Sequence, residues 1–312
     1  MTTTWARPLE NLLGEFEAHL LAARGREAHS LMGFGMTDLY LEALEAGDAD
    51  NFIQIARAHP VYHVAYQDPF TKRCVDKPRG YAGDAVMLDY LYSRTAPEGT
   101  TDIGKLWFSF TATGSCALSV RYRKALLQAF IDDTVVRCPN YQIFSVASGH
   151  CRELAESLVF DNKFSGRFVA FDQDSESCAL VEREYAARAE RRVEVIRQGI
   201  RQLFIATNPL IHQRFDLIYS AGLYDYLDEK TARALTRILR SMLRPGGRLV
   251  LANFTPHTAE RGYMAAMMDW HLIFRTPAEL VALFGKDVAD QVSHAMDPHV
   301  NVVYAEYRAP SE

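Results

Sequence analysis

From residue 141 onward, short apolar runs alternate with stretches in which apolar residues recur at helical spacing. Alternation of this length is typical of βαβ units, whose parallel strands form one sheet covered by helices on both faces. A last run, Val300–Tyr307, alternates well enough to close the sheet as an edge strand. The expected strands before it are Tyr141–Ala147, Arg167–Phe171, Val193–Arg197, Phe215–Ser220 and Arg248–Phe254. The sequence therefore predicts a doubly wound, mostly parallel α/β sheet.

Helical patterns fill the intervals between and after these strands. Pro245-Gly246-Gly247 is expected to be a sharp break between a helix and the strand that follows it. The predicted helices are Cys151–Val159, Ser175–Arg191, Lys230–Leu243, Gly262–Phe274 and Pro277–Phe284.

Residues 1–134 contain helical patterns and no β-alternation of useful length. This part cannot supply a parallel sheet, so we expect a helical extension or lid at 1–134 and a ligand-binding sheet domain at 135–312. Its predicted helices are Leu9–Ala23, Met36–Glu45, Asn51–Ala58, Ala85–Tyr92 and Leu118–Ile131. Arg121 and Arg123 in the last of these are interpreted as solvated helix-face charges.

Composition excludes several classes of protein. A net charge of −5 argues against a nucleic-acid-binding surface. No apolar run approaches the roughly 18 residues of a membrane span, and no apolar signal-peptide core begins the chain. We therefore expect a cytoplasmic protein with no membrane partner. The five cysteines form no Cys-x-x-Cys pair, which favours reduced thiols and argues against a metal site.

The first strand leads into a turn, Ser148-Gly149, and then into a helical pattern, an arrangement that presents free N–H groups to a charged ligand. Cys151 in this turn is interpreted as a small residue tolerated in tight geometry. Asp172 ends the second strand, about 25 residues after the turn, where an acid can accept hydrogen bonds from a ribose diol. Asp174 is expected to cap the next helix instead.

The remaining strand ends are also polar or small. Ligands in a doubly wound sheet bind beyond the carboxyl ends of the strands, so these residues are candidates for the site. They are Gln198-Gly199-Ile200-Arg201 after the third strand, Ser220 to Tyr226 after the fourth, and Asn253 to Pro256 after the fifth.

The order of these features, with Leu243-Arg-Pro-Gly-Gly-Arg-Leu-Val250 before the fifth strand, resembles the class I S-adenosylmethionine (SAM)-dependent methyltransferases. The resemblance implies a seven-stranded, Rossmann-like sheet with SAM as cofactor. It departs from the family pattern at Ser145, Ala147, Cys151 and Ile200, where the family usually has an acid, two glycines and an acid. The implied cofactor-binding residues are Ser145, Ala147, Ser148, Gly149, Asp172, Gln173, Gly199, Ile200, Arg201, Ser220 and Gly222.

Four further segments resemble one bacterial subgroup of this family: Asp68-Pro-Phe-Thr71, Lys77 to Asp84, Asn253-Phe254 and Asp269 to Arg275. This resemblance spans almost the whole chain. Members of that subgroup are labelled as makers of 3-hydroxypalmitic acid methyl ester, and it is similar to enzymes that cyclise SAM to azetidine-2-carboxylic acid. The expected activity is methyl transfer to a small, acidic molecule. SAM cyclisation with release of methylthioadenosine, and SAM binding without catalysis, remain the alternatives.

The segment Asp68–Asp84 holds two prolines and two glycines among charged groups, so we expect it to lack regular structure and to contact substrate. The alternative is a structured linker whose arginines and aspartates pair with one another. The predicted catalytic residues are Tyr81, Asp84, Asn253 and Tyr224, and the predicted substrate-binding residues are Arg79, Tyr81, Trp107 and Trp270. Each aromatic residue is alternatively plain core. His271 is interpreted as a half-buried histidine on an amphipathic helix, not as a base.

Overall fold

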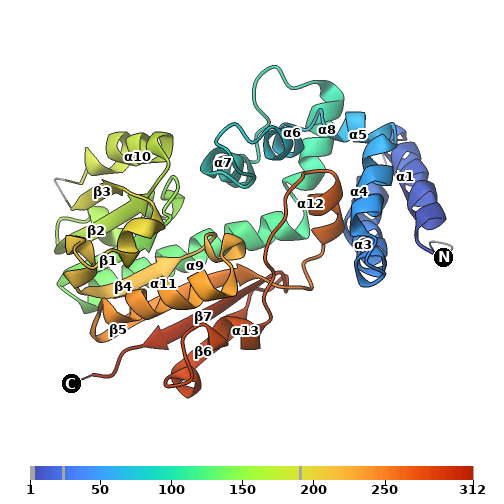
Figure 1. Cartoon of the computed structure of the whole chain (residues 1–312). Coiled ribbons are helices and arrows are strands. Elements are labelled where there is room, and N and C mark those ends of the chain that lie inside the picture. Colours follow the sequence, from blue (N-terminus) through green and yellow to red (C-terminus); the bar gives the residue numbers. More distant parts are fainter. Residues whose placement is uncertain (1–3, 23–24, 190–191, 312) are drawn as a thin grey trace. The chain divides into compact units, whose positions relative to one another are not determined.

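The computed structural model describes residues 4–22, 25–189 and 192–311 (Figure 1). The chain forms two compact units. The first comprises Met1–Arg121 and His257–His271, and the second comprises Tyr122–Pro256 and Leu272–Glu312. Each unit is described by itself below.

The second unit is built on one seven-stranded sheet in the order β3-β2-β1-β4-β5-β7-β6. The pairs from β3 to β5 are parallel, whereas β7 is antiparallel to both β5 and β6. The strands are β1 Asn140–Val146, β2 Ser165–Asp172, β3 Val193–Arg197, β4 Phe215–Ser220, β5 Leu243–Phe254, β6 Val292–Met296 and β7 Val302–Arg308. The predicted doubly wound, mostly parallel α/β sheet is confirmed.

Helices cover both faces of this sheet, as Figure 1 shows for α9 (Ser115–Arg137) and α11 (Glu229–Ser241). Side chains alternate along each strand, so Phe144 packs in one core with α11 and α13 (Pro277–Ala282). Ile143 packs in the other core with the second half of α9 and with α10 (Ser175–Val181). A π-helical turn, η4 (Glu182–Ala186), continues α10, while Arg191, the predicted end of this helix, lies outside the described residues.

Three sheet predictions need correction. The last strand is not an edge strand, because β6, which the sequence did not predict, pairs beyond it. Pro245-Gly246-Gly247 lies inside β5, where the register with β4 shifts, and does not break the chain before the strand. A side chain at Gly247 would lie 2.7 Å from the Phe215 carbonyl oxygen, so the close approach of two backbones requires this glycine. The helix predicted at Cys151–Val159 is only two 3₁₀ turns, η2 (Arg152–Leu154) and η3 (Leu158–Phe160).

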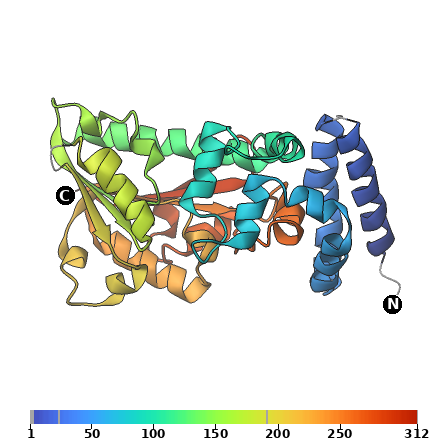
Figure 2. The ribbon, with the colours of Figure 1, turned by 90° about the horizontal axis from the view of Figure 1, so that it is seen from above.

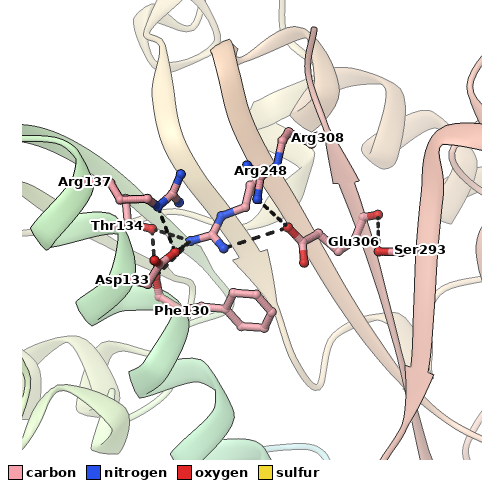
Figure 3. Close-up of polar contacts among 8 residues, drawn as sticks. All are labelled: Phe130, Asp133, Thr134, Arg137, Arg248, Ser293, Glu306 and Arg308. Carbon is pink, nitrogen blue, oxygen red and sulfur yellow. Dashed lines mark hydrogen bonds and ion pairs between the residues drawn. The ribbon is translucent and has the colours of Figure 1, made fainter. Parts of the chain in front are cut away.

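Arg248 of β5 fastens α9 to the sheet (Figure 3). Its side chain is 5% exposed, and its Nη2 donates to Asp133 Oδ2 at 2.6 Å and to Thr134 Oγ1 at 3.0 Å. The guanidinium lies 5.1 Å from the centre of the Phe130 ring, and Nη1 lies 3.9 Å from Glu306 of β7. These contacts fix the second half of α9 in position over β5 and β7.

The first unit is helical in its described residues. In addition to the first turns of α9, it contains α12 (Arg261–Ala266), which comes from the segment between β5 and α13 and packs on α3 and α4 (Figure 2). Its other elements are α1 Ala6–Leu21, α2 Gly25–Ser30, the π-helical η1 Leu31–Gly35, α3 Met36–Glu45, α4 Ala49–Ala58, α5 Val61–Ala65, α6 Pro69–Asp76, α7 Ala85–Ser93 and α8 Asp102–Thr111. Ala23, the predicted end of the first helix, lies outside the described residues.

Two predictions in this unit are wrong. Asp68–Asp84 was expected to be irregular, but Asp68 caps α6 by accepting hydrogen bonds from the N–H groups of Phe70 and Thr71. Pro69 at the first helical position favours this helix, because proline has the required φ and lacks an N–H that would be unpaired there. The helix predicted at Gly262–Phe274 ends after α12, and the chain turns at Asp269 with φ +49°. His271 is therefore exposed on non-helical chain.

Candidate functional site

The turn after β1 has an alternating backbone. Ala147, Gly149 and Cys151 have φ of 56°, 54° and 49°, so every second residue is left-handed. This conformation costs a non-glycine residue roughly 1–2 kcal/mol, and such strain is concentrated at functional sites. The Ser148 N–H donates to the Phe171 carbonyl oxygen at 3.2 Å, which holds the turn against the end of β2.

Asp172 is held at the end of β2 by main-chain donors. The Gly149 N–H donates to Oδ2 at 2.8 Å, and the Asp174 N–H donates to Oδ1 at 2.9 Å. A carboxylate offers about four acceptor positions on its two oxygens, so it can accept further hydrogen bonds from a ligand. Burial raises the pKa of the Asp172 carboxyl, and the hydrogen bonds from the main chain partly offset that effect. Asp174 caps α10 through the Glu176 N–H, as predicted.

Cys151 is not a reactive thiol. The side chain is 1% exposed, and burial raises its pKa well above the ordinary value. A thiol that stays protonated is a poor nucleophile, which supports its interpretation as a small residue tolerated in the turn.

Gln173 and Gly199, two of the implied cofactor-binding residues, lie together after β2 and β3. An added side chain at Gly199 would lie 3.2 Å from Gln173 Oε1, so the two positions are neighbours in space. Gly199 precedes the 3₁₀ turn η5 (Ile200–Phe204), in which Ile200 packs against the core and Arg201 is exposed. The apolar Ile200 side chain suits contact with the face of an aromatic heterocycle, and the polar side chains of Gln173 and Arg201 suit hydrogen bonds at its edge.

Ser145 and Ser220 lie buried at the ends of the two central strands. Ser220 Oγ donates to the Val146 carbonyl oxygen at 3.0 Å and joins the end of β4 to that of β1. Ser145 pairs in register with Tyr219, whose hydroxyl donates to Glu153 Oε1 at 2.6 Å. Burial raises the pKa of the Glu153 carboxyl, and Arg123 opposes that shift.

Arg123 and Glu153 are site candidates that the sequence interpretation missed. Arg123 is 6% exposed, so its interpretation as a solvated charge is wrong. A signal was present, because Arg123 lies three residues after Val120 and four before Leu127, both buried on the same helix face. An ideal side chain at Gly222 would lie 4.0 Å from Arg123 Nη1, which brings α9 to the end of β4.

Two predicted catalytic residues of the second unit have structural partners. The Asn253 amide donates to the Phe254 and Ile273 carbonyl oxygens, and its oxygen accepts from Arg275 at 2.7 Å. The Tyr224 side chain is fully buried, and its hydroxyl is 2.9 Å from Thr236 of α11. Tyr224, predicted as a catalytic residue, therefore faces the core of the second unit.

In the first unit, Asp84 caps α7 by accepting from the Met87 N–H at 2.9 Å. The Arg73 Nε donates to its two oxygens at 2.8 and 2.9 Å. This ion pair matches the alternative in which arginine and aspartate of the segment pair with each other. Arg79 and Tyr81 are half-buried in the irregular part after α6.

The two tryptophans predicted to bind substrate lie in the core of the first unit. Trp107 is 1% exposed, and its Nε1 donates to the Tyr263 hydroxyl at 2.8 Å. Trp270 is 8% exposed and meets the Phe70 ring edge-on, with 6.5 Å between ring centres. Both contacts are those of plain core aromatics.

Known structures match this fold at low sequence identity. A possible exported protein from Bordetella parapertussis has a TM-score of 0.58 and 21% identity, over 73% of this chain and 80% of that one. The SAM-dependent methyltransferase SibL in its apo form has a TM-score of 0.50 and 17% identity, over 99% of this chain and 96% of that one. The chain thus has the Rossmann-like methyltransferase fold. No family model and no curated protein matches its sequence.

The described residues lack a membrane-spanning helix and a metal-binding cluster. No helix there is long and apolar enough to cross a membrane. No group of three or more histidine, cysteine, aspartate or glutamate residues in that part of the chain is arranged to hold a metal ion.

Proposed function

We propose that the protein is a SAM-dependent methyltransferase. The observation that carries the proposal is Asp172, whose carboxylate main-chain N–H groups hold at the end of β2. The two oxygens of a carboxylate in this position suit the two hydroxyls of a ribose.

The residues around Asp172 fit the rest of the cofactor. The left-handed turn Ala147–Cys151 brings main-chain groups to the end of β1, where the amino-acid end of SAM would lie. Gln173, Gly199 and Ile200 would flank the adenine. SAM, when bound, supplies a methyl group on a sulfonium, and the protein has to hold the acceptor about 3 Å from it in line.

The acceptor we propose is a small molecule with a carboxylate. A carboxylate needs no general base to accept a methyl group, whereas a hydroxyl or an ammonium must lose a proton. Asp84, Asn253 and Tyr224, three of the predicted catalytic residues, already have hydrogen-bond partners within their own units. That arrangement favours a reaction in which the protein only orients an acceptor that is already deprotonated.

The test is incubation of purified protein with SAM, first alone and then with a panel of small carboxylic acids. S-adenosylhomocysteine should form only when an acceptor is present. Methylthioadenosine formed from SAM alone would show the cyclase instead, and SAM that is bound but never consumed would show a binding protein. Asp172→Ala should lose the activity, while Asp174→Ala, which removes only a helix cap, should keep it.

A further inference from the structure

Glu153 is a buried carboxyl group that the proposed reaction does not use. Its side chain is 8% exposed, and it lies in the 3₁₀ turn η2, directly after the left-handed turn that follows β1. Removing a carboxylate from water is costly unless hydrogen bonds compensate for the lost hydration. The fold keeps this acid in spite of that cost.

The Tyr219 hydroxyl of β4 binds this carboxyl group. It donates to Glu153 Oε1 at 2.6 Å, and both side chains are buried. Burial raises the pKa of Tyr219 well above its ordinary value, so the hydroxyl keeps its proton and remains a donor. Since β4 lies between β1 and β5, Glu153 ties the chain after the turn to the middle of the sheet.

The turn itself needs support. Its first and last residues, Ala147 and Cys151, have φ of 56° and 49°, a conformation that only glycine adopts without a steric cost. The Ser148 and Gly149 N–H groups bind the end of β2 and hold the first half of the turn. The second half, with Cys151, leads away from β2 into η2.

Glu153 fixes this second half. It lies two residues after Cys151, and the Leu154 N–H donates to the Cys151 carbonyl oxygen at 2.9 Å. If Cys151 relaxed to a negative φ, the chain after it would leave in another direction, and Glu153 would no longer reach Tyr219. The buried hydrogen bond therefore requires Cys151 to be left-handed, and it offsets the cost of that conformation.

We propose that Glu153 is a positioning residue, which through Tyr219 keeps the turn Ala147–Cys151 in the left-handed form that binds the amino-acid end of SAM. A hydrogen bond from a hydroxyl to a carboxylate is charge-assisted and stronger than one between neutral groups, so it suits this role. The inference rests on the proposed function for its ligand and deepens it.

The test combines loss and rescue in calorimetric binding of S-adenosylhomocysteine. Glu153→Leu removes the acceptor and should weaken binding roughly 5- to 30-fold, the effect of one left-handed residue whose cost is no longer offset. Cys151→Gly in the same chain should restore most of the affinity, because glycine adopts this φ freely. Cys151→Ala is the matched control. It removes the same thiol but keeps the side-chain carbon that causes the cost, so it should not restore binding.

Further variants separate the hydrogen bond from packing. Glu153→Gln keeps an acceptor for Tyr219 and should lose less affinity than Glu153→Leu. Tyr219→Phe removes the donor and should lose as much as Glu153→Leu. Tyr141→Phe should leave binding unchanged, because Tyr141 is buried in the same core but its hydroxyl donates to the Val159 carbonyl oxygen. Should Glu153→Leu fail to fold, the rescue by Cys151→Gly is measured on Tyr219→Phe.

Hydrogen exchange of the protein without ligand measures order in the turn directly. The Ser148 and Gly149 amides are hydrogen-bonded in the wild-type protein and should exchange faster in Glu153→Leu. Cys151→Gly in the same chain should return them to the wild-type rate. Wild-type protein that does not bind S-adenosylhomocysteine would overturn the proposed function, and exchange alone would then test Glu153.

Three results would overturn the inference. The first is a Glu153→Leu protein that matches the wild-type protein in exchange, or in affinity where the wild-type protein binds. The second is a loss that Cys151→Gly does not reverse, which would mean that Glu153 acts on the core and not on the turn. The third is an equal rescue by Cys151→Ala, which would mean that the thiol and not the left-handed backbone is responsible.

Discussion

The Gly149 N–H donates a hydrogen bond to Asp172 Oδ2 over 2.8 Å, which joins the turn after β1 to the end of β2. The same carboxylate that is proposed to hold the ribose therefore also holds the turn next to it. The proposed function thus implies that ribose binding and order in the turn are coupled through this one side chain.

Asp172→Ala should weaken SAM binding by about 2 kcal/mol, the loss of charge-assisted hydrogen bonds. Isothermal calorimetry measures the affinity, with Asp174→Ala as control, because Asp174 caps α10 and its main-chain N–H is retained. Equal affinities of wild-type protein and Asp172→Ala would contradict the ribose assignment.

Loss of Asp133 and loss of Arg248, the two partners of the ion pair between α9 and β5, should lower the stability of the protein by different amounts. Asp133→Ala leaves the buried Arg248 cation short of a partner and should lower the free energy of unfolding by about 2 kcal/mol. Arg248→Met leaves Asp133, whose side chain is 48% exposed, in contact with water and should cost less, about 1 kcal/mol. Urea unfolding compares the two. A larger loss of unfolding free energy in Arg248→Met than in Asp133→Ala would mean that the packing of the Arg248 side chain contributes more than the compensation of its charge.

Asp225 should make stability depend on pH. It is 3% exposed, it accepts the Phe254 N–H at 2.7 Å, and burial raises its pKa from 3.8 to about 7. The folded state thus binds this proton more tightly than the unfolded state. The stabilisation is complete below about pH 4 and is lost as the pH rises through about 7, at up to roughly 1.4 kcal/mol per unit.

Asp225→Asn stays neutral and should escape this loss. Its free energy of unfolding minus that of the wild-type protein should therefore increase between pH 5 and pH 8 in urea titrations. A difference that is constant with pH would show that Asp225 does not titrate in this range.

A chain of donors crosses the core of the first unit. Trp107 Nε1 donates to the Tyr263 hydroxyl, which lies 2.7 Å from Thr71 Oγ1, and Thr71 donates to Asp68 at 2.8 Å. Tyr263→Phe leaves the Trp107 N–H buried without an acceptor and should cost about 2 kcal/mol of stability. Thermal unfolding measures this, with Tyr66→Phe as control, since the hydroxyl of Tyr66 bonds in an exposed position. Equal melting temperatures of Tyr263→Phe and Tyr66→Phe would contradict a stabilising role of this series of hydrogen bonds.

The central strands were predictable because they are buried on both faces. β4 lies between β1 and β5 and has the predicted bounds, since an apolar run bounded by polar residues leaves little choice of register. β3 also has the predicted bounds, although it is an edge strand and only Val193 in it is buried. β6 was missed because its middle residues, Ser293 to Ala295, are exposed and show no alternation. At the edge of a sheet, pairing with the neighbouring strand determines the conformation, and a single sequence does not record that.

The place of Asp172 at the end of β2 was predictable, because it follows from the order of strand and turn, while its role toward a ligand stays a prediction. The site was not predictable where a side chain found a partner far away in the sequence. Asn253 meets Arg275, and Tyr224 meets Thr236, so polar groups at strand ends became parts of the scaffold. Arg123 was not predictable either, because its helix face turned inward and buried it.

The segment that carries α12 has a consequence for how the chain folds during synthesis. The Tyr263 hydroxyl that pairs with Trp107, and the backbone that accepts from Arg57, belong to residues made after β5. The ribosome therefore releases the first 121 residues well before their core can be completed. A fragment that ends there would expose the surfaces of α3 and α4 that α12 covers, and would be prone to aggregation. The helical unit of this protein thus begins first along the chain but is completed only after β5 has been made.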